Sequence, residues 1–260
     1  MTRWFDQLPF RLGTTSYIIP DDILPNARYL ADKVRDIELV LFDIDEYCNI
    51  PDEDQVSELM YISASYGVSY TVHLPLNLNF SEGAMDVSIE KALRVINGTR
   101  DLLPLAYVCH LECRSLSPDL PADALSEWQR QREKAVDALT SAAGIPAAAL
   151  AVENLESYPI DWNERVIRSR GTSACLDIGH LFLREVDPVP VMREWLGRTS
   201  VVHLHGVGTR DHQSLRHMSA DQVRAVVREL IRADYRGVVT LEVFNEQDLF
   251  ESMEMIRECL

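Results

Sequence analysis

The chain has 260 residues, 47% of them hydrophobic, and a formal net charge of −16 at pH 7. It has no apolar run of about 18 residues and no secretion signal in residues 1–10, so we expect a cytoplasmic protein without a membrane span. The negative charge argues against nucleic acid as a partner, because affinity for nucleic acid comes largely from Lys and Arg side chains that neutralise phosphates.

Eight segments with the composition of buried strands alternate with eight helix candidates. The strand candidates are residues 11–16, 37–42, 69–74, 105–111, 149–154, 172–178, 199–205 and 237–243. The helix candidates are residues 24–34, 54–66, 86–101, 122–142, 160–169, 188–197, 219–233 and 246–258. Several strands are rich in Val, Ile and Leu, as expected when both faces of a parallel strand are covered.

Eight β-α units in about 250 residues predict a single (β/α)8 TIM barrel that spans residues 1–260 as one domain. A doubly wound sheet is the alternative, but its usual glycine-rich fingerprint after the first strand is missing. Helix ends agree with this assignment, since Ser219 and Gln222 form a capping box and Gly67 and Gly144 directly follow helical runs.

Cysteines and arginines add little evidence of a site. The cysteines, at positions 48, 109, 113, 175 and 259, are odd in number and form no C-x-x-C pair, so we interpret them as reduced thiols. The arginines within residues 128–132 lie on a helix candidate and are interpreted as part of a solvated face.

Side chains that bind metals recur where the strand candidates end. These residues are His73, His110, Glu153, Asp177 with His180, His203 with His205, and Glu242. All of them fall in the last two or three residues of a strand candidate or just beyond it, and none falls at a strand start. Because active sites of TIM barrels lie at the carboxyl ends of the strands, this one-sided distribution predicts a site there.

Strand alternation directs these side chains towards the barrel axis. In the segment from Val201 to His205, both histidines point one way while Val202 and Leu204 point the other. Carboxylates that converge on the axis need a charge partner, and no Lys lies at a strand end, so a divalent cation is the simplest partner. Nitrogen and oxygen ligands suit Zn²⁺, Mn²⁺, Fe²⁺ or Co²⁺ without choosing among them.

Each residue also has a purely structural explanation. His73 and His110 fit hydrogen-bonded histidines at strand ends, while Asp177 and Glu242 fit caps of a turn or helix. Their occurrence together is what favours a metal site over these separate explanations.

The order of these residues on an eight-unit barrel resembles the xylose isomerase-like TIM barrel superfamily, which includes endonuclease IV and the sugar epimerases. The resemblance covers nearly the whole chain. It implies that Glu153, Asp177, His203 and Glu242 form the metal site that the superfamily shares. This quartet does not separate the members of the superfamily.

The other histidines resemble the endonuclease IV branch. That resemblance implies a first metal held by His73, His110 and Glu153, with Glu153 bridging to a second metal in the shared site. It assigns His180 and His212 to a third metal. The carboxylate that the pattern expects two residues before His212 is replaced by Arg210, and Asp211 is out of register. We therefore expect two divalent ions, Zn²⁺ or Mn²⁺, and leave the third position open.

Several longer segments are similar to the CbiR family of cobamide-remodelling phosphodiesterases. They are residues 11–17, 22–26, 37–42, 175–180, 203–206 and 211–215. The resemblance implies a small-molecule partner, a cobamide such as coenzyme B12, whose nucleotide loop is hydrolysed. The implied products are cobinamide phosphate and the riboside of the lower ligand.

The roles that follow are those of metal-assisted phosphodiester hydrolysis. Glu153 and Glu242 are the expected catalytic residues, with Glu153 orienting the attacking water and accepting its proton. His205, Arg210 and Asp211 are the expected substrate contacts. The segments 76–86 and 112–122 are long enough to form loops over the barrel mouth.

Three other functions remain open. A sugar isomerase or epimerase would use Glu153 and Glu242 as an acid–base pair and would need neither His73 nor His110. A DNA-repair endonuclease would want a basic surface, which the net charge disfavours. A non-catalytic cobamide- or metal-binding protein would tolerate replacement of Glu153 by Gln.

Overall fold

The computed structural model describes residues 3–44, 47–111 and 121–260. Eight parallel strands form a closed barrel in the order β1, β10, β9, β8, β7, β6, β5, β2. Their bounds are β1 Arg11–Thr15, β2 Asp36–Val40, β5 Ser69–His73, β6 Tyr107–Cys109, β7 Leu150–Glu153, β8 Ser173–Asp177, β9 Thr199–Leu204 and β10 Val238–Leu241. The prediction of a (β/α)8 TIM barrel is confirmed.

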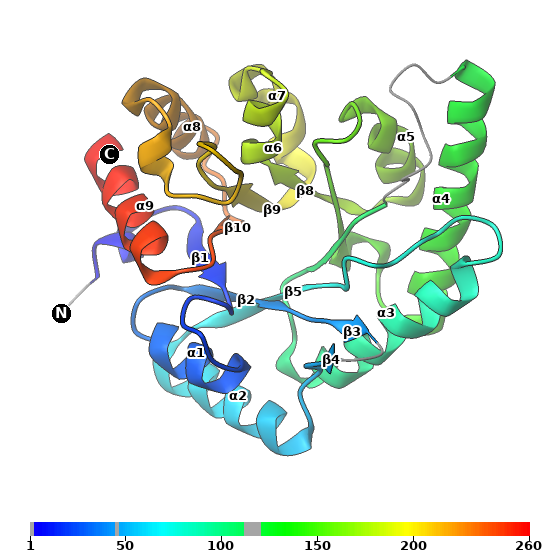
Figure 1. The fold of residues 1–260 in the computed structure, drawn as a ribbon, viewed down its shortest axis with the longest axis horizontal. Coiled ribbons are helices and arrows are strands. Elements are labelled where there is room, and N and C mark those ends of the chain that lie inside the picture. The colour runs from blue at the N-terminus through cyan, green and yellow to red at the C-terminus, as the bar shows by residue number, and fades with distance from the viewer. Residues whose placement is uncertain (1–2, 45–46, 112–120) are drawn as a thin grey trace.

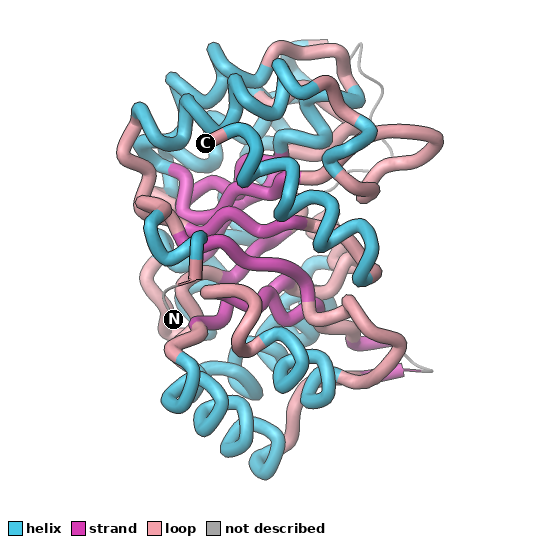
Figure 2. Tube along the Cα trace, turned by 90° about the vertical axis from the view of Figure 1, so that its left-hand side faces the viewer, coloured by secondary structure: helices cyan, strands magenta, loops and turns pink. Residues whose placement is uncertain are grey.

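Helices surround the strands on all sides (Figure 1) and enclose them when the molecule is turned (Figure 2). They are α1 Ile23–Leu30, α2 Glu53–Tyr66, α3 Met85–Thr99, α4 Ala122–Ala143, α5 Asp161–Arg170, α6 Ile178–Leu183, α7 Pro188–Trp195, α8 Ala220–Arg232 and α9 Glu246–Cys259. Short 3-10 turns flank them at η1 Trp4–Gln7, η2 Arg100–Leu102, η3 Ala147–Ala149, η4 Leu196–Arg198 and η5 Leu215–His217. Among these helices, none combines the length and apolar character needed to cross a lipid bilayer.

The barrel closes between its first and last strands. Arg11 pairs with Val238 and Leu12 with Val239, while the other edge of β1 pairs with β2 through Gly13 and Asp36. A Cβ atom at position 13 would lie 2.8 Å from the carbonyl oxygen of Asp36, so glycine permits the close approach of these two strands.

Strand alternation directs one set of side chains outward to the helices and the other set into the barrel. The outward side chains join the helices in one large hydrophobic core. Inside the barrel, a second apolar cluster contains Ala106, Val108, Ala151, Cys175, Val201 and Val238. Polar residues follow on the same inward faces towards the carboxyl ends of the strands. The fold therefore places apolar side chains beneath the polar residues at the ends of β6 to β10, while β2 contributes the buried polar residues Asp36 and Glu38.

Two strands and one helix were not predicted from the sequence. Residues Asp43–Ile44 and Tyr47–Cys48 form the short antiparallel strands β3 and β4 after β2, outside the barrel (Figure 1). Helix α6 follows β8 without a loop, because Asp177 ends the strand and caps the helix at once.

The predicted solvated arginine face is wrong in part. Arg132 is fully buried, where its guanidinium donates to the carbonyl oxygens of Phe80 and Leu111 and lies 5.1 Å from the Trp128 ring. Arg130 remains on the exposed side of α4. The four described cysteines are free, as expected for reduced thiols.

Candidate metal centre

Six strand ends bring their polar side chains to the barrel mouth. His73, Glu153 and Asp177 are the last residues of β5, β7 and β8. His203 lies near the end of β9, and His110 and Glu242 directly follow β6 and β10. All six are buried except His110, which is partly exposed. The structure thus brings together the residues that the sequence places at strand ends.

Glu153 lies at the centre of this group. Its Oε2 atom is 3.3 Å from His73 Nε2 and 3.0 Å from His110 Nε2, and 3.7 Å from His203 Nδ1. Burial alone would raise the pKa of Glu153, but the imidazoles of His110 and His203 hold it well below its usual range. Glu153 is therefore a carboxylate at neutral pH, shared between two sets of nitrogen and oxygen atoms.

The first set consists of His73, His110 and Glu153, and the second of Glu153, Asp177, His203 and Glu242. Within each set, one candidate ligand atom per residue lies within 4.8 Å of every other. Asp177 Oδ2, His203 Nδ1 and Glu242 Oε2 are buried and have no hydrogen-bond partner among the described residues. Buried atoms of this kind are costly unless paired, and a divalent cation would satisfy all three at once. The second set therefore fits a metal ion.

The ligand atoms are held in place by hydrogen bonds on their far sides. Asp177 Oδ1 accepts the backbone N–H of His180 at 2.7 Å, which leaves Oδ2 to face the cluster. His73 Nδ1 donates to the carbonyl oxygen of Leu74 at 2.8 Å, which leaves Nε2 for Glu153 or a metal. His180 Nδ1 donates in the same way to the carbonyl oxygen of Asn154 at 2.9 Å. Such bonds fix the tautomer and direction of a metal-binding imidazole.

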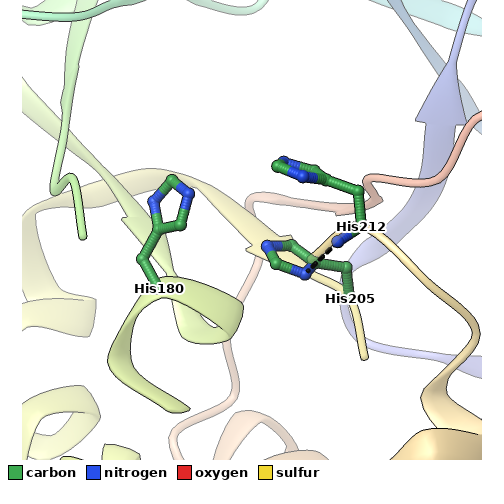
Figure 3. Close-up of side chains that lie close together, drawn as sticks. All are labelled: His180, His205 and His212. Atoms are coloured by element: carbon green, nitrogen blue, oxygen red, sulfur yellow. Dashed lines mark hydrogen bonds between the residues drawn. The ribbon is translucent and has the colours of Figure 1, made fainter. Parts of the chain in front are cut away.

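A third group consists of His180, His205 and His212, whose rings lie close together (Figure 3). It adjoins the second set, since His205 Nε2 is 3.4 Å from Asp177 Oδ1 and His212 Nε2 is 3.3 Å from Glu242 Oε2. The rings of His205 and His212 stack at 4.2 Å, and His180 stands nearly perpendicular to both. Three imidazoles thus meet where the sequence pattern left the third metal open. An all-nitrogen group of this kind is a ligand set for Zn²⁺ or Co²⁺ rather than for Mg²⁺.

The position of His205 changes its expected role. It is fully buried, and its Nδ1 atom accepts the backbone N–H of His212 at 3.0 Å (Figure 3). The bridge between Gly206 and Gln213 folds the following loop back over it. His205 therefore lies beneath His212 and is not among the residues that line the pocket.

The other two expected substrate contacts differ from each other. Asp211 lines the pocket, and its Oδ1 atom is 3.2 Å from His212 Nδ1. Arg210 is exposed on the outer side of the loop, where its backbone N–H donates to Gln213 and its guanidinium contacts the carbonyl oxygen of Asp211. Arg210 is not among the residues that line the pocket.

Charges within the cluster shift its pKa values in opposite directions. Burial lowers the pKa of His180 and of His212, but nearby carboxylates, Asp177 for His180 and Glu242 for His212, outweigh it and raise both values to about 9. Burial would raise the pKa of Glu242, yet His203 and His212 hold it well below its usual range. Without metal, Glu153 and Glu242 are therefore ionised, and His180 and His212 are protonated on both ring nitrogens at neutral pH.

The cluster forms the floor of a pocket of about 310 Å³. Its polar lining consists of His73, His110, Glu153, Glu156, His180, Asp211, His212 and Glu242. Its apolar lining consists of Val40, Phe42, Leu76, Leu155 and Phe244, and the last of these rings lies 5.5 Å from the His212 ring. The predicted loop at 76–86 leads from β5 to α3 and contributes Leu76. Most of the predicted loop at 112–122 lies outside the described residues.

One residue near the cluster was missed by the sequence analysis. Glu38, in the middle of β2, is fully buried with its Oε2 atom 3.0 Å from His203 Nε2. The sequence does contain a signal that could have identified Glu38, because a glutamate between Ile37 and Leu39 is unusual in an otherwise apolar strand. Cys175 lies near Glu153 and His203, but burial raises the pKa of its thiol well above the usual value, so it stays protonated.

Comparison with known proteins agrees with this architecture. Among solved structures, the chain is similar to a D-tagatose 3-epimerase-like protein, with a TM-score of 0.74 and 19% identity over 96% of this chain and 97% of that one. It is also similar to 3-keto-D-glucoside 4-epimerase from E. coli, with a TM-score of 0.73 and 15% identity over 96% and 100%. The values for endonuclease IV from Thermus thermophilus are 0.70 and 16%, over 96% and 98%.

These identities are low, so the structural similarities show the fold alone. No curated protein has a sequence that matches this chain significantly. A family model described as a xylose isomerase-like TIM barrel, however, matches residues 36–259, which is most of the sequence. The chain therefore belongs to the xylose isomerase-like TIM barrel family.

Proposed function

We propose that this protein is a metal-dependent phosphodiesterase that hydrolyses the nucleotide loop of cobamides. The observation that carries the proposal is the extension of the shared four-residue set by His73 and His110, both of which contact Glu153 Oε2. A single-metal sugar enzyme has no use for these two imidazoles. They would give Glu153 the place of a carboxylate between two metal positions, an arrangement typical of phosphoryl-transfer sites.

His73, His110 and Glu153 would hold one ion, and Glu153, Asp177, His203 and Glu242 would hold the other. Bound divalent ions supply Lewis acidity towards phosphate oxygens and lower the pKa of water, so that a nucleophile is available at neutral pH. Zn²⁺ and Mn²⁺ both suit these mixed nitrogen and oxygen ligands.

The protein side chains would position and protonate the substrate. Glu153, ionised and buried, orients the attacking water and accepts its proton, while Glu242 restrains the opposite side of the cluster. His180 and His212 face the pocket and donate hydrogen bonds to the oxygen that leaves the phosphorus. These donors are aimed at the place where negative charge develops, which is how hydrogen bonds lower a reaction barrier.

The pocket fits part of a cobamide rather than the whole molecule. Its volume of about 310 Å³ accommodates a phosphodiester and one adjoining group, and the remaining corrinoid would lie across the apolar rim of Phe42, Leu76 and Phe244. The net charge of −16 disfavours DNA, whose backbone would be repelled. The similarity of residues 203–206 and 211–215 to the cobamide-remodelling family supports the choice of substrate class.

A sugar epimerase is the second candidate, and a specific observation favours it. Glu153 and Glu242 both belong to the four-residue set and are both buried, as an acid–base pair across one metal would require. The two proposals differ in what they require of His110, which makes that residue the decisive one.

The test is to incubate metal-loaded protein with adenosylcobalamin, DNA with abasic sites and a panel of ketoses, and to separate the products by chromatography. We expect cleavage of adenosylcobalamin alone. His110→Ala should lower that cleavage at least about a hundredfold, because one metal position loses a ligand. His217→Ala, at an exposed histidine outside the cluster, is the matched control and should retain activity. Intact adenosylcobalamin together with an epimerised ketose would replace the first proposal with the second.

A further inference from the structure

Glu38 is an ionisable side chain placed inside the barrel where no solvent reaches it. It is fully buried, and its Oε2 atom lies 3.0 Å from His203 Nε2. The hydroxyl of Thr240 is 3.5 Å from the same oxygen, and Oε1 has no hydrogen-bond partner among the described residues. Burying this side chain costs folding free energy, since an apolar residue of similar volume would fill the space without loss of solvation.

The contact with Glu38 determines which ring nitrogen of His203 is left to bind a metal ion. A carboxylate accepts hydrogen bonds, so His203 Nε2 carries a proton and donates a hydrogen bond to Glu38. The other nitrogen, Nδ1, then faces the cluster, 3.1 Å from Glu242 Oε2 and 3.8 Å from Asp177 Oδ2. Neither of these contacts has hydrogen-bond geometry, so His203 Nδ1 is without a hydrogen-bond partner among the described residues.

Two neighbouring histidines are restrained in an equivalent way by main-chain atoms. His73 and His180 each donate from Nδ1 to a carbonyl oxygen, at 2.8 Å and 2.9 Å, and present Nε2 to the cluster. His203 has the opposite orientation, with Nδ1 towards the cluster and Nε2 towards β2. It therefore needs an acceptor on the floor of the barrel, and Glu38 is the residue that supplies one.

We propose that Glu38 is a positioning residue for the metal centre, which holds His203 so that Nδ1 can bind a metal ion. This inference rests on the metal site of the proposed function but not on the cobamide substrate. Partners of this kind orient the ring and raise its basicity, and their loss lowers metal affinity by roughly 10- to 100-fold.

The experiment compares three variants with the wild-type protein by competition for Zn²⁺ against a coloured chelator, without substrate. Glu38→Leu removes the acceptor, and we expect a loss of affinity of roughly 10- to 100-fold. Glu38→Gln keeps an oxygen that accepts from Nε2, so its loss should be smaller. Asp36→Asn is the matched control, because Asp36 is equally buried on the same strand but bonds to Ser69 and Thr71 rather than to a candidate ligand.

A spectroscopic measurement separates positioning from a general loss of stability. The visible spectrum of the cobalt-loaded protein reports ligand geometry, and we expect it to change in Glu38→Leu but not in Asp36→Asn. If Glu38→Leu does not fold, a several-fold loss in Glu38→Gln carries the test. Wild-type affinity and spectrum in whichever Glu38 variant folds would overturn the inference, whatever the enzyme hydrolyses. Failure to cleave cobamides, with these metal results as expected, would overturn only the proposed function.

Discussion

Asp36 and Glu38 both extend from β2 into the barrel, but they form hydrogen bonds with different partners. Ser69 and Thr71 donate hydrogen bonds to Asp36 at 2.6 and 2.7 Å, so its carboxyl group is tied to β5 rather than to the candidate ligands. Burial raises the pKa of Asp36 to about 7, against the lowering effect of these two hydroxyls.

This shift predicts a pH dependence of stability. An acid with a raised pKa in the folded state binds more protons when folded, so the free energy of unfolding falls as pH rises from about 4 to about 7 and then levels off. Asp36→Asn cannot ionise and should lack this fall, gaining up to about 4 kcal/mol relative to wild type across the window at about 1.36 kcal/mol per pKa unit.

Urea unfolding of both proteins between about pH 5 and about pH 8 measures the difference. Asp101→Asn, at an exposed aspartate, serves as the control and should follow the wild-type curve. Parallel curves for wild type and Asp36→Asn would show that this carboxyl is not the titrating group.

Among the secondary-structure elements, α6 matters most to the site because it follows β8 directly. Asp177 caps the helix with one carboxylate oxygen while the other faces the cluster, so strand end, helix start and candidate ligand coincide in one residue. Gly179 lies in the first turn of α6, where a Cβ atom would lie 2.1 to 2.5 Å from atoms of the His205 ring. Helix α6 and the His205 ring are thus packed without room for a methyl group.

Gly179→Ala therefore sets two effects against each other. Alanine favours a helix over glycine by about 0.5 to 1 kcal/mol, but forcing a methyl group into a filled space costs about 1 to 3 kcal/mol. We expect a net loss of stability in chemical unfolding, with displacement of the His205 ring. Gly197→Ala, where nothing lies within 4 Å of the new Cβ atom, should be close to neutral. A more stable Gly179→Ala protein would contradict the packing argument.

Elements of this fold differ in how well the sequence predicts them. The eight long β-α units follow from alternating apolar strands and amphipathic helices, because each is long enough for its period to be read. Helix α6 has six residues, too few for a helical hydrophobic period to be distinguished from that of a strand. Strands β3 and β4 have two residues each and therefore show no hydrophobic period. All three elements were missed for this reason.

Site residues show the same division. Strand ends indicated the residues that converge, because the carboxyl ends of parallel strands meet at one face. Glu38 was missed because its partner His203 lies 165 residues away across the barrel, and only closure brings them together. Alternation correctly directed His205 inward, but no local pattern indicated that the bridge between Gly206 and Gln213 would cover it.

For the molecule as a whole, metal removal should lower thermal stability. Candidate ligands come from six strands, and the unfolded chain does not hold them together, so metal binds the folded state selectively. Binding at about 1,000 times Kd stabilises a protein by about 4 kcal/mol, which corresponds to roughly 10 °C in Tm for a chain of this size.

Differential scanning calorimetry before and after chelation, with Zn²⁺ or Mn²⁺ added back, checks this expectation. A Glu153→Ala variant loses the residue common to both ligand sets, so chelator should change its Tm little. Equal melting of wild-type protein with and without metal would argue against a bound ion in the folded state.

The pairing of β1 with β10 also determines when, during synthesis of the chain, the candidate ligands come together. When the ribosome has reached residue 200, His73, His110, Glu153 and Asp177 exist, but the two strands that close the barrel are not yet available. His203 and Glu242 arrive with those strands, after the other two members of the four-residue set. A nascent chain that stops before β10 therefore lacks a complete four-residue set, and this set forms only after β10 has paired with β1.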